Sequence, residues 1–124
     1  MDPRYAALAS VMTEYFDGLY HSDAARLARV FHPQATYACA SDGTLTHLSM
    51  DAYLPMVERR PSPASRNEPR ADRILSIAFA GPVTALVQAQ CAIGPRRFTD
   101  LLSFVQIDER WQIIAKVFHF DLVE

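Results

Sequence analysis

Few side chains in this sequence are suited to acid/base chemistry, and they lie far apart. His119 is the best candidate for a general acid or base, because imidazole titrates near neutrality. Tyr15 is the second candidate, although it also lies on the apolar stripe of a helical pattern, which favours a structural role. His21 and His32 fall at the ends of helical segments, where a cation complements the helix dipole, so both are interpreted as structural.

Nucleophilic and metal chemistry have weaker support. Cys39 has no evident His and Asp beside it, so a buried small hydrophobe is favoured over a nucleophile. A metal site built from His32, His47, His119 and Asp42 would lack any close-spaced ligand pair. The sequence also lacks a phosphate-binding glycine loop, a nucleophile-elbow serine, an HExxH motif and a CxxC motif. We therefore expect no metal and no cofactor.

The composition is that of an ordinary globular domain. The chain has 124 residues, 50% of them hydrophobic and 21% charged, with a formal net charge of −2. Basic residues form no stripe, which argues against nucleic-acid binding. No stretch approaches the roughly 20 apolar residues of a membrane span, and the N-terminus lacks a signal-peptide core. A cytoplasmic protein with two reduced thiols, Cys39 and Cys91, is the expected outcome.

Helical patterns fill the first half of the chain. Residues 3–21 carry apolar residues at helical spacing. Ser22 is expected to cap a second helix that Pro33 ends. A third helix is expected after Ser49, kinked or shortened at Pro55. Two short strands, 35–40 and 44–48, are predicted between the second and third helices.

From residue 73 the pattern changes to strands separated by tight turns. The predicted strands cover 74–80, 83–93, 98–107 and 111–120, which favours an antiparallel meander. Helices followed by a meander indicate an α+β fold in one domain, 1–124, with the helices on one face of the sheet. The segment 61–72 has a loop composition and is either a lid over a pocket or, more commonly, a plain surface connection.

Both faces of the last three strands carry apolar residues. Ser103 and Val105 share one face of their strand, while Leu102 and Phe104 share the other. One face must cover the helices, so a homodimer that pairs the remaining sheet faces is expected. Asp100 falls opposite Ser103 by parity, which favours a role at the dimer face or the rim.

Several short motifs together resemble one family. These are Ser22-Asp23 after the first helix, Phe31-His32-Pro33, Phe98-Thr99-Asp100, and the strand from Trp111 to Lys116. The pattern resembles the SnoaL-like and "putative lumazine-binding" branch of the nuclear transport factor 2-like superfamily. The resemblance implies a curved antiparallel sheet wrapped round the N-terminal helices, shaped as a cone with an internal pocket.

The steroid isomerase branch of this superfamily supplies a catalytic template of one tyrosine and two acids. Laid onto this chain, the resemblance puts Tyr15 at the oxyanion-binding tyrosine, Cys39 at the carboxylate base, Ser103 near the second acid and His119 near an aromatic wall position. Asp42 or Lys116 would lie near the rim of the pocket. The residues expected to line the pocket are Tyr37, Cys39, His47, Tyr53, Ser103 and Val117. Because both acids are missing, steroid isomerisation by that mechanism is not expected.

Two functions therefore remain, beside a third interpretation as an interaction module that uses the sheet face and resembles simple homodimerisation. The first is a domain that binds a small apolar molecule without turnover, which the missing carboxylate base favours. The second is an acid/base enzyme (an isomerase, dehydratase or cyclase) that acts on a cyclic carbonyl or hydroxyl compound, with Tyr15 polarising an oxygen and His119 moving the proton.

Overall fold

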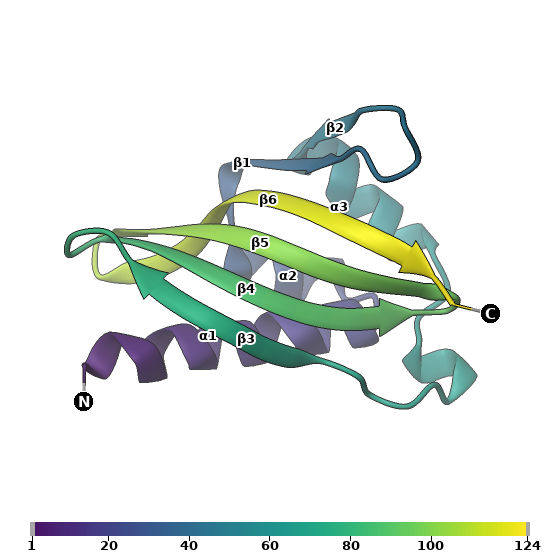
Figure 1. Cartoon of the computed structure of the whole chain (residues 1–124), viewed down its shortest axis with the longest axis horizontal. Helices are drawn as coiled ribbons and strands as arrows, with labels where there is room; N and C mark the ends of the chain where they lie inside the picture. The colour runs from purple at the N-terminus through teal and green to yellow at the C-terminus, as the bar shows by residue number, and fades with distance from the viewer. Residues whose placement is uncertain (1, 124) are drawn as a thin grey trace.

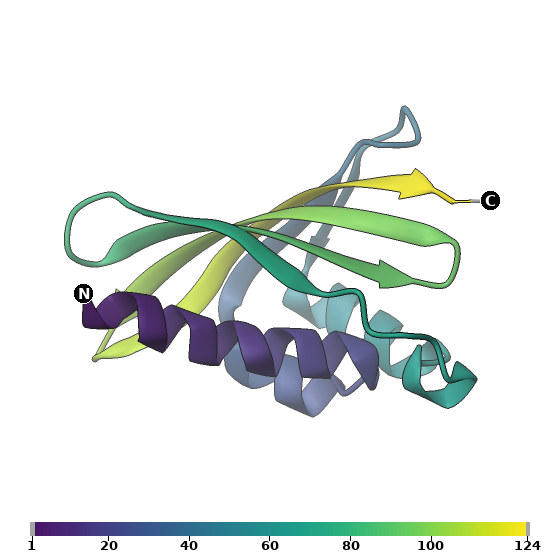
Figure 2. The same ribbon diagram turned by 60° about the horizontal axis from the view of Figure 1, so that its bottom comes forward.

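A computed structural model describes residues 2–123 of the chain as a curved six-stranded sheet with helices on one face. Figures 1 and 2 show all three helices on the same side of the sheet. The elements in chain order are α1 (Pro3–Tyr20), α2 (Ala24–Val30), β1 (Phe31–Cys39), β2 (Thr46–Ser49), α3 (Met50–Arg59), the 3₁₀ turn η1 (Ala64–Arg66), β3 (Arg73–Phe79), β4 (Thr84–Ile93), β5 (Arg96–Ile107) and β6 (Arg110–Leu122). The predicted α+β class is confirmed.

The sheet combines the predicted meander with two strands from the first half of the chain. Its order is β2-β1-β6-β5-β4-β3, and β3 to β6 form the antiparallel meander. β1 runs parallel to β6, and β2 pairs antiparallel with β1 at one edge. We call the sheet face that packs on the helices the inner face and the opposite one the outer face.

The connection between the first two helices differs from the expected one. Asp23, not Ser22, caps α2, since its Oδ1 accepts a hydrogen bond from the backbone N–H of Arg26 at 3.0 Å. Ser22 instead adopts a left-handed conformation with φ 50° and makes the turn. α2 then ends at Val30, three residues before Pro33, and Phe31 already begins β1. The expected end at Pro33 and the expected strand start at residue 35 were therefore both too late.

Close packing of α1 on α2 fixes the helical layer. A Cβ placed on Gly18 would lie 2.7 Å from Leu27 Cδ2, so any larger residue at this position would force the Leu27 side chain to move. The inner face of the sheet closes the core over this layer. Fully buried core side chains from helices and sheet include Leu8, Met12, Leu27, Val87, Leu102, Phe104 and Ile113.

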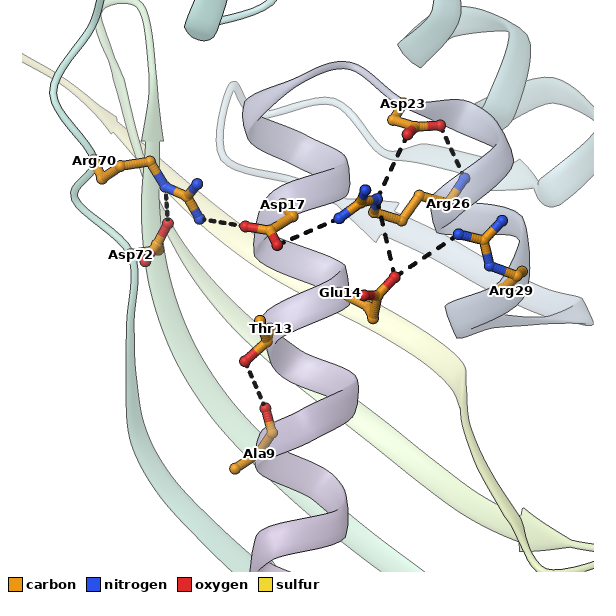
Figure 3. Close-up of polar contacts among 9 residues, drawn as sticks. All are labelled: Ala9, Thr13, Glu14, Asp17, Asp23, Arg26, Arg29, Arg70 and Asp72. Carbon is orange, nitrogen blue, oxygen red and sulfur yellow. Dashed lines mark hydrogen bonds and ion pairs between the residues drawn. The ribbon is translucent and has the colours of Figure 1, made fainter.

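Polar contacts tie the segment after α3 to α1, as Figure 3 shows. The Arg70 guanidinium contacts Asp17 at 3.0 Å and Asp72 at 2.7 Å, and it lies 4.5 Å from the ring centre of Tyr20. Tyr20 in turn donates a hydrogen bond to the backbone carbonyl of Glu68. Asp17 also pairs with Arg26 of α2 at 3.3 Å, so one carboxylate joins three segments of the chain. These contacts fit a fixed connection better than a lid.

Two further observations concern the described residues 2–123. Cys39 and Cys91 are both buried and neither forms a disulfide. Among these residues, no helix is both long enough and apolar enough to cross a membrane.

Candidate functional site

A cavity opens between α3 and the inner face of the sheet, at the end where β1 and β6 finish. Its volume is about 380 Å³, and we call it the outer chamber. A recess of about 10 Å³, close to the size of one water molecule, shares three of its wall residues, and we call it the inner recess. The outer chamber is lined by Tyr37, Cys39, Asp42, Thr46, Met56, Arg60, Arg96, Phe98, Phe118 and Phe120. The inner recess is lined by Leu19, Tyr37, Tyr53, Arg60, Cys91, Ile93, Phe98 and Lys116.

Lys116 is the only lysine in the chain, and it lies at the inner recess. Its side chain is 5% exposed, and β6 holds it inside a box of aromatic rings. The Nζ atom lies 5.1 to 5.6 Å from the ring centres of Tyr15, Tyr37, Tyr53 and Phe118. No side-chain hydrogen bond or ion pair within residues 2–123 involves this ammonium group, so its direct contacts are cation–π contacts with the rings.

A buried tyrosine–carboxylate pair lies behind the lysine. The Tyr15 hydroxyl donates a hydrogen bond to Asp100 Oδ2 at 2.5 Å, and both residues are fully buried. Asp100 Oδ1 has no hydrogen-bond partner. Burial, followed by the nearby Asp100 carboxylate, raises the pKa of Tyr15 well above its usual value, so the phenol stays protonated. Neither residue is among those that line the two cavities.

The same surroundings keep Lys116 charged. Burial alone would lower the pKa of Lys116, but the oxygens around it, those of Tyr53 and Asp100 first, favour the ammonium form. The net effect raises the pKa of Lys116 above its usual value. Because a protonated amine is not a nucleophile, the recess presents a fixed cation that suits an oxygen atom of a ligand.

The position of Asp100 corrects the expected dimer-face or rim role. Asp100 does lie opposite Ser103 on β5, as parity predicts, but its face is the inner one, shared with Leu102 and Phe104. Ser103 therefore lies on the outer face, half-buried and away from both cavities. Ser103 was expected to line the pocket, and in the structure it does not.

Val117 and His119 also lie on the outer face, contrary to expectation. Register between β5 and β6 shifts at Ser103/Phe104, where Ile114 is an extra residue on β6. This bulge reverses the side-chain alternation, so Lys116 and Phe118 point inward. His119 is 58% exposed in its side chain and contacts Ser41 Oγ at 2.7 Å and Asp121 Oδ1 at 3.0 Å. Neither cavity includes it.

The remaining expected residues divide between the pocket and the surface. Tyr37 and Cys39 of β1 lie on the wall of the outer chamber, and Tyr53 of α3 lies on the wall of the inner recess. His47 is exposed on the edge strand β2 and lines neither cavity. Among residues 2–123, no group of three His, Cys, Asp or Glu is arranged to hold a metal ion.

Three cationic residues of the pocket were missed as site residues: Lys116, which was expected only near the rim, Arg60 and Arg96. A sequence signal for Lys116 exists, since it is the single lysine of the chain and directly follows an apolar stretch of the sequence. Arg60 directly follows α3 and Arg96 begins β5. Each belongs to an Arg-Arg pair, Arg59-Arg60 and Arg96-Arg97, but such a pair beside a turn does not by itself indicate a pocket.

A second groove of about 390 Å³ lies at the other end of the sheet, between α1, α2 and the β5–β6 turn. Three of its four charged residues, all except Glu109, have a polar partner among the described residues. Arg29 pairs with Glu14 at 3.8 Å, and Arg110 donates to the Arg29 carbonyl at 2.7 Å. The groove therefore offers a ligand fewer free polar groups than the recess does.

Comparisons with known proteins agree with this architecture. Aldolase FrzH from Cladobotryum sp is 25% identical over 117 residues, which cover 93% of this chain and 90% of that protein. A nuclear transport factor 2-like protein of unknown function from Silicibacter pomeroyi DSS-3 superposes with a TM-score of 0.84 at 24% identity, covering 95% of this chain and 96% of the other. A ketosteroid isomerase-like protein from Erwinia carotovora atroseptica SCRI1043 superposes with a TM-score of 0.74 at 9% identity, covering 97% and 98%. Residues 3–119 match the family described as "Putative lumazine-binding", and the chain belongs to that family. Its fold is that of the nuclear transport factor 2-like proteins it superposes on.

Proposed function

We propose that this protein binds a small, largely apolar molecule in the outer chamber and places one oxygen of that molecule on Lys116. The observation that carries the proposal is the state of Lys116, a buried ammonium group at a recess with no acceptor engaged. A buried cation is stabilised when a ligand supplies a hydrogen-bond acceptor in low dielectric surroundings.

The walls of the outer chamber favour an apolar ring system. Phe98, Phe118 and Phe120 line it together with Tyr37, and their rings pack against one another at centre distances of 4.8 to 6.0 Å. Ring faces of this kind bury flat apolar surface, which is the main source of affinity in small-molecule sites. Membership in the "Putative lumazine-binding" family supports ligand binding in general.

The acid/base enzyme is the second candidate, and two observations favour it. A cation at a narrow recess would stabilise negative charge that develops on a carbonyl oxygen, as in an enolate. The similarity to aldolase FrzH supports carbonyl chemistry. In this function Lys116 would be the catalytic residue, and Tyr15 with Asp100 would position it from behind.

A matched-pair binding screen tests the proposal. One comparison sets the ketone β-tetralone against the hydrocarbon tetralin, and a second sets lumazine against protein without ligand. The midpoint of thermal unfolding is measured for each sample. A ligand at a hundred times its dissociation constant adds about 2.7 kcal/mol, which is a clear shift. We expect the ketone to stabilise the wild type more than the hydrocarbon, and the Lys116→Met variant to lose this difference. Equal shifts for ketone and hydrocarbon in the wild type would overturn the role of Lys116.

The same samples separate a binder from an enzyme. Mass spectrometry of recovered carbonyl probes, incubated singly and in pairs with an aldehyde, reports any product. Unchanged probes support a binding domain, whereas a product that the Lys116→Met variant no longer forms supports the enzyme.

We further propose that two copies pair through the outer face. Leu86, Leu101 and Val117 lie on three adjacent strands of this face and are 43%, 42% and 51% exposed. Apolar side chains in such a cluster favour a protein partner over water. Light scattering on the purified protein should give a dimer, and Leu101→Glu should give a monomer that binds the same probes.

A further inference from the structure

The residues that line the pocket include more cations than carboxylates. Lys116, Arg60 and Arg96 line the two cavities, against one carboxylate, that of Asp42. A third cleft of about 240 Å³ adjoins the outer chamber and shares Arg60, Arg96 and Phe98 with it. Its remaining lining residues are Pro61, Arg66, Ile93, Gly94 and Pro95, none of which is acidic. Arg66 pairs with Glu68 at 3.8 Å, so Arg60 and Arg96 are the cations of the entrance without a carboxylate partner among the described residues, in a chain whose net charge is −2.

Arg60 and Phe98 line all three spaces, and the guanidinium of Arg60 has no ion-pair or hydrogen-bond partner among the described residues. No ion pair within residues 2–123 involves Arg60, whereas Arg26, Arg29 and Arg70 on the helical side each pair with at least one carboxylate. The Nε and Nη2 atoms of Arg60 are buried and have no hydrogen-bond partner. Nε–H and Nη2–H form one edge of the guanidinium plane, the edge that binds a carboxylate through two parallel hydrogen bonds.

Arg96 lies beside Arg60 on the same two walls and is also free of carboxylates. Its guanidinium carbon lies 4.4 Å from the ring centre of Phe120, a lining residue of the outer chamber. No ion pair among the described residues involves Arg96. Asp42, the one acid of the chamber, accepts a hydrogen bond from the backbone N–H of Thr44 at 3.1 Å instead.

We propose that the molecule bound in the outer chamber is an apolar carboxylate, with its carboxylate group between Arg60 and Arg96 and its ring system against Phe98, Phe118 and Phe120. This inference rests on the proposed function, because it specifies the class of ligand for the same pocket. Lys116 then binds a second oxygen of the ligand at the inner end, so the two polar points fix the orientation of the ring system. An anionic ligand also balances the excess of cations that the lining carries.

A pair of probes of nearly equal shape tests the charge requirement. 1-Naphthylacetate and 1-naphthylacetamide differ in the carboxylate alone, and their dissociation constants are measured by titration calorimetry at low and high salt. We expect the wild type to bind the acid about tenfold or more tightly than the amide. Since the entrance is open to solvent, the preference should fall as salt rises.

Variants locate the effect. Arg60→Gln should bring the two dissociation constants close together, and Arg96→Gln should reduce the preference in part. Arg59→Gln is the matched control, because Arg59 is exposed, adjacent to Arg60 and absent from the cavity walls. Thermal unfolding of each variant reports whether it is folded, and Arg96→Gln keeps the test decisive if Arg60→Gln does not fold.

Each contrary result has a distinct meaning. Equal binding of the acid and the amide by the wild type overturns the carboxylate subsite and leaves the oxygen site at Lys116 standing. Binding of β-tetralone without binding of either naphthyl probe has the same meaning. If the tetralone and both naphthyl probes all fail to bind, the proposed function falls together with the inference. A preference for the acid that survives both arginine substitutions overturns the location.

Discussion

Tyr15 and Asp100 are 85 residues apart in the sequence and form a buried hydrogen bond of 2.5 Å beneath the aromatic box of Lys116. This bond joins α1 to the inner face of β5. It leaves one oxygen of Asp100 without a partner, at a place where the negative charge supports the nearby ammonium. The pair thus links the stability of the core to the electrostatics of the recess.

The first prediction concerns removal of the Tyr15 hydroxyl. Tyr15→Phe leaves both oxygens of a buried carboxylate without a donor, so the free energy of unfolding should fall by about 1–3 kcal/mol. Urea unfolding measures the change. Tyr5→Phe is the matched control, because Tyr5 is 40% exposed, and its effect should stay within about 0.5 kcal/mol. Equal effects of the two substitutions would show that the buried bond does not stabilise the fold.

The second prediction concerns stability at alkaline pH. Burial, and then the nearby Asp100 carboxylate, raises the pKa of Cys91 from 9.0 to about 12, and the pKa values of Tyr15 and Lys116 are also raised. A raised pKa means that the native state holds its proton more tightly than the unfolded state. The stabilisation is complete below the unfolded pKa and is lost as pH rises toward the native one.

Unfolding free energy should therefore decline from about pH 9 upward, by up to about 1.4 kcal/mol per pH unit for each group that only the unfolded state has deprotonated. Denaturant titrations at a series of pH values measure the slope. Cys91→Ala removes one of the three groups and should make the decline shallower just above pH 9. A flat profile between pH 9 and 11 would contradict the assigned shifts.

The third prediction uses the single lysine of the chain. Because Lys116 is buried and held as an ammonium ion, acetic anhydride at neutral pH should leave it unmodified in the native protein. The same reagent should acetylate it in urea, and peptide mass analysis distinguishes Lys116 from the N-terminal amine. Reductive trapping with β-tetralone and cyanoborohydride should likewise give no adduct on Lys116. An adduct would show that the residue reacts as an amine, and the cation role would be wrong.

The sequence predicted the order of the elements well, since each depends on local patterns. Helical spacing identified α1, and the turns around Gly81 and Gly94 separated the strands of the meander. Faces were harder to predict, because both sides of β5 and β6 carry apolar residues. Parity separated Asp100 from Ser103 correctly, but hydrophobicity did not reveal which face packs on the helices.

The β-bulge at Ile114 explains the misplaced residues at the end of β6. Trp111 and Ile113 point inward, and uninterrupted alternation would also turn Val117 and His119 inward. One extra residue reverses that alternation, so Lys116 points into the interior and His119 points to the outer face. Nothing in the local sequence marks the bulge, because it arises from pairing with β5 across the sheet.

The last prediction concerns the contact between α1 and α2. Gly18→Ala would favour an isolated helix by about 1 kcal/mol, since alanine has the higher helix propensity. In the folded protein the new methyl group would meet Leu27 Cδ2 at 2.7 Å and Leu27 Cγ at 2.8 Å. Leu27 is fully buried, so it has little space into which to move.

We therefore expect Gly18→Ala to destabilise the protein by about 1–3 kcal/mol in urea unfolding, against its helix propensity. Ser10→Ala in the exposed part of α1 is the matched control, and it should be neutral or slightly stabilising. The double variant Gly18→Ala, Leu27→Ala removes the opposing side chain and should show a smaller effect of the glycine change. If Gly18→Ala instead stabilises the protein as much as Ser10→Ala does, then the contact between Gly18 and Leu27 leaves room for a methyl group and the prediction is wrong.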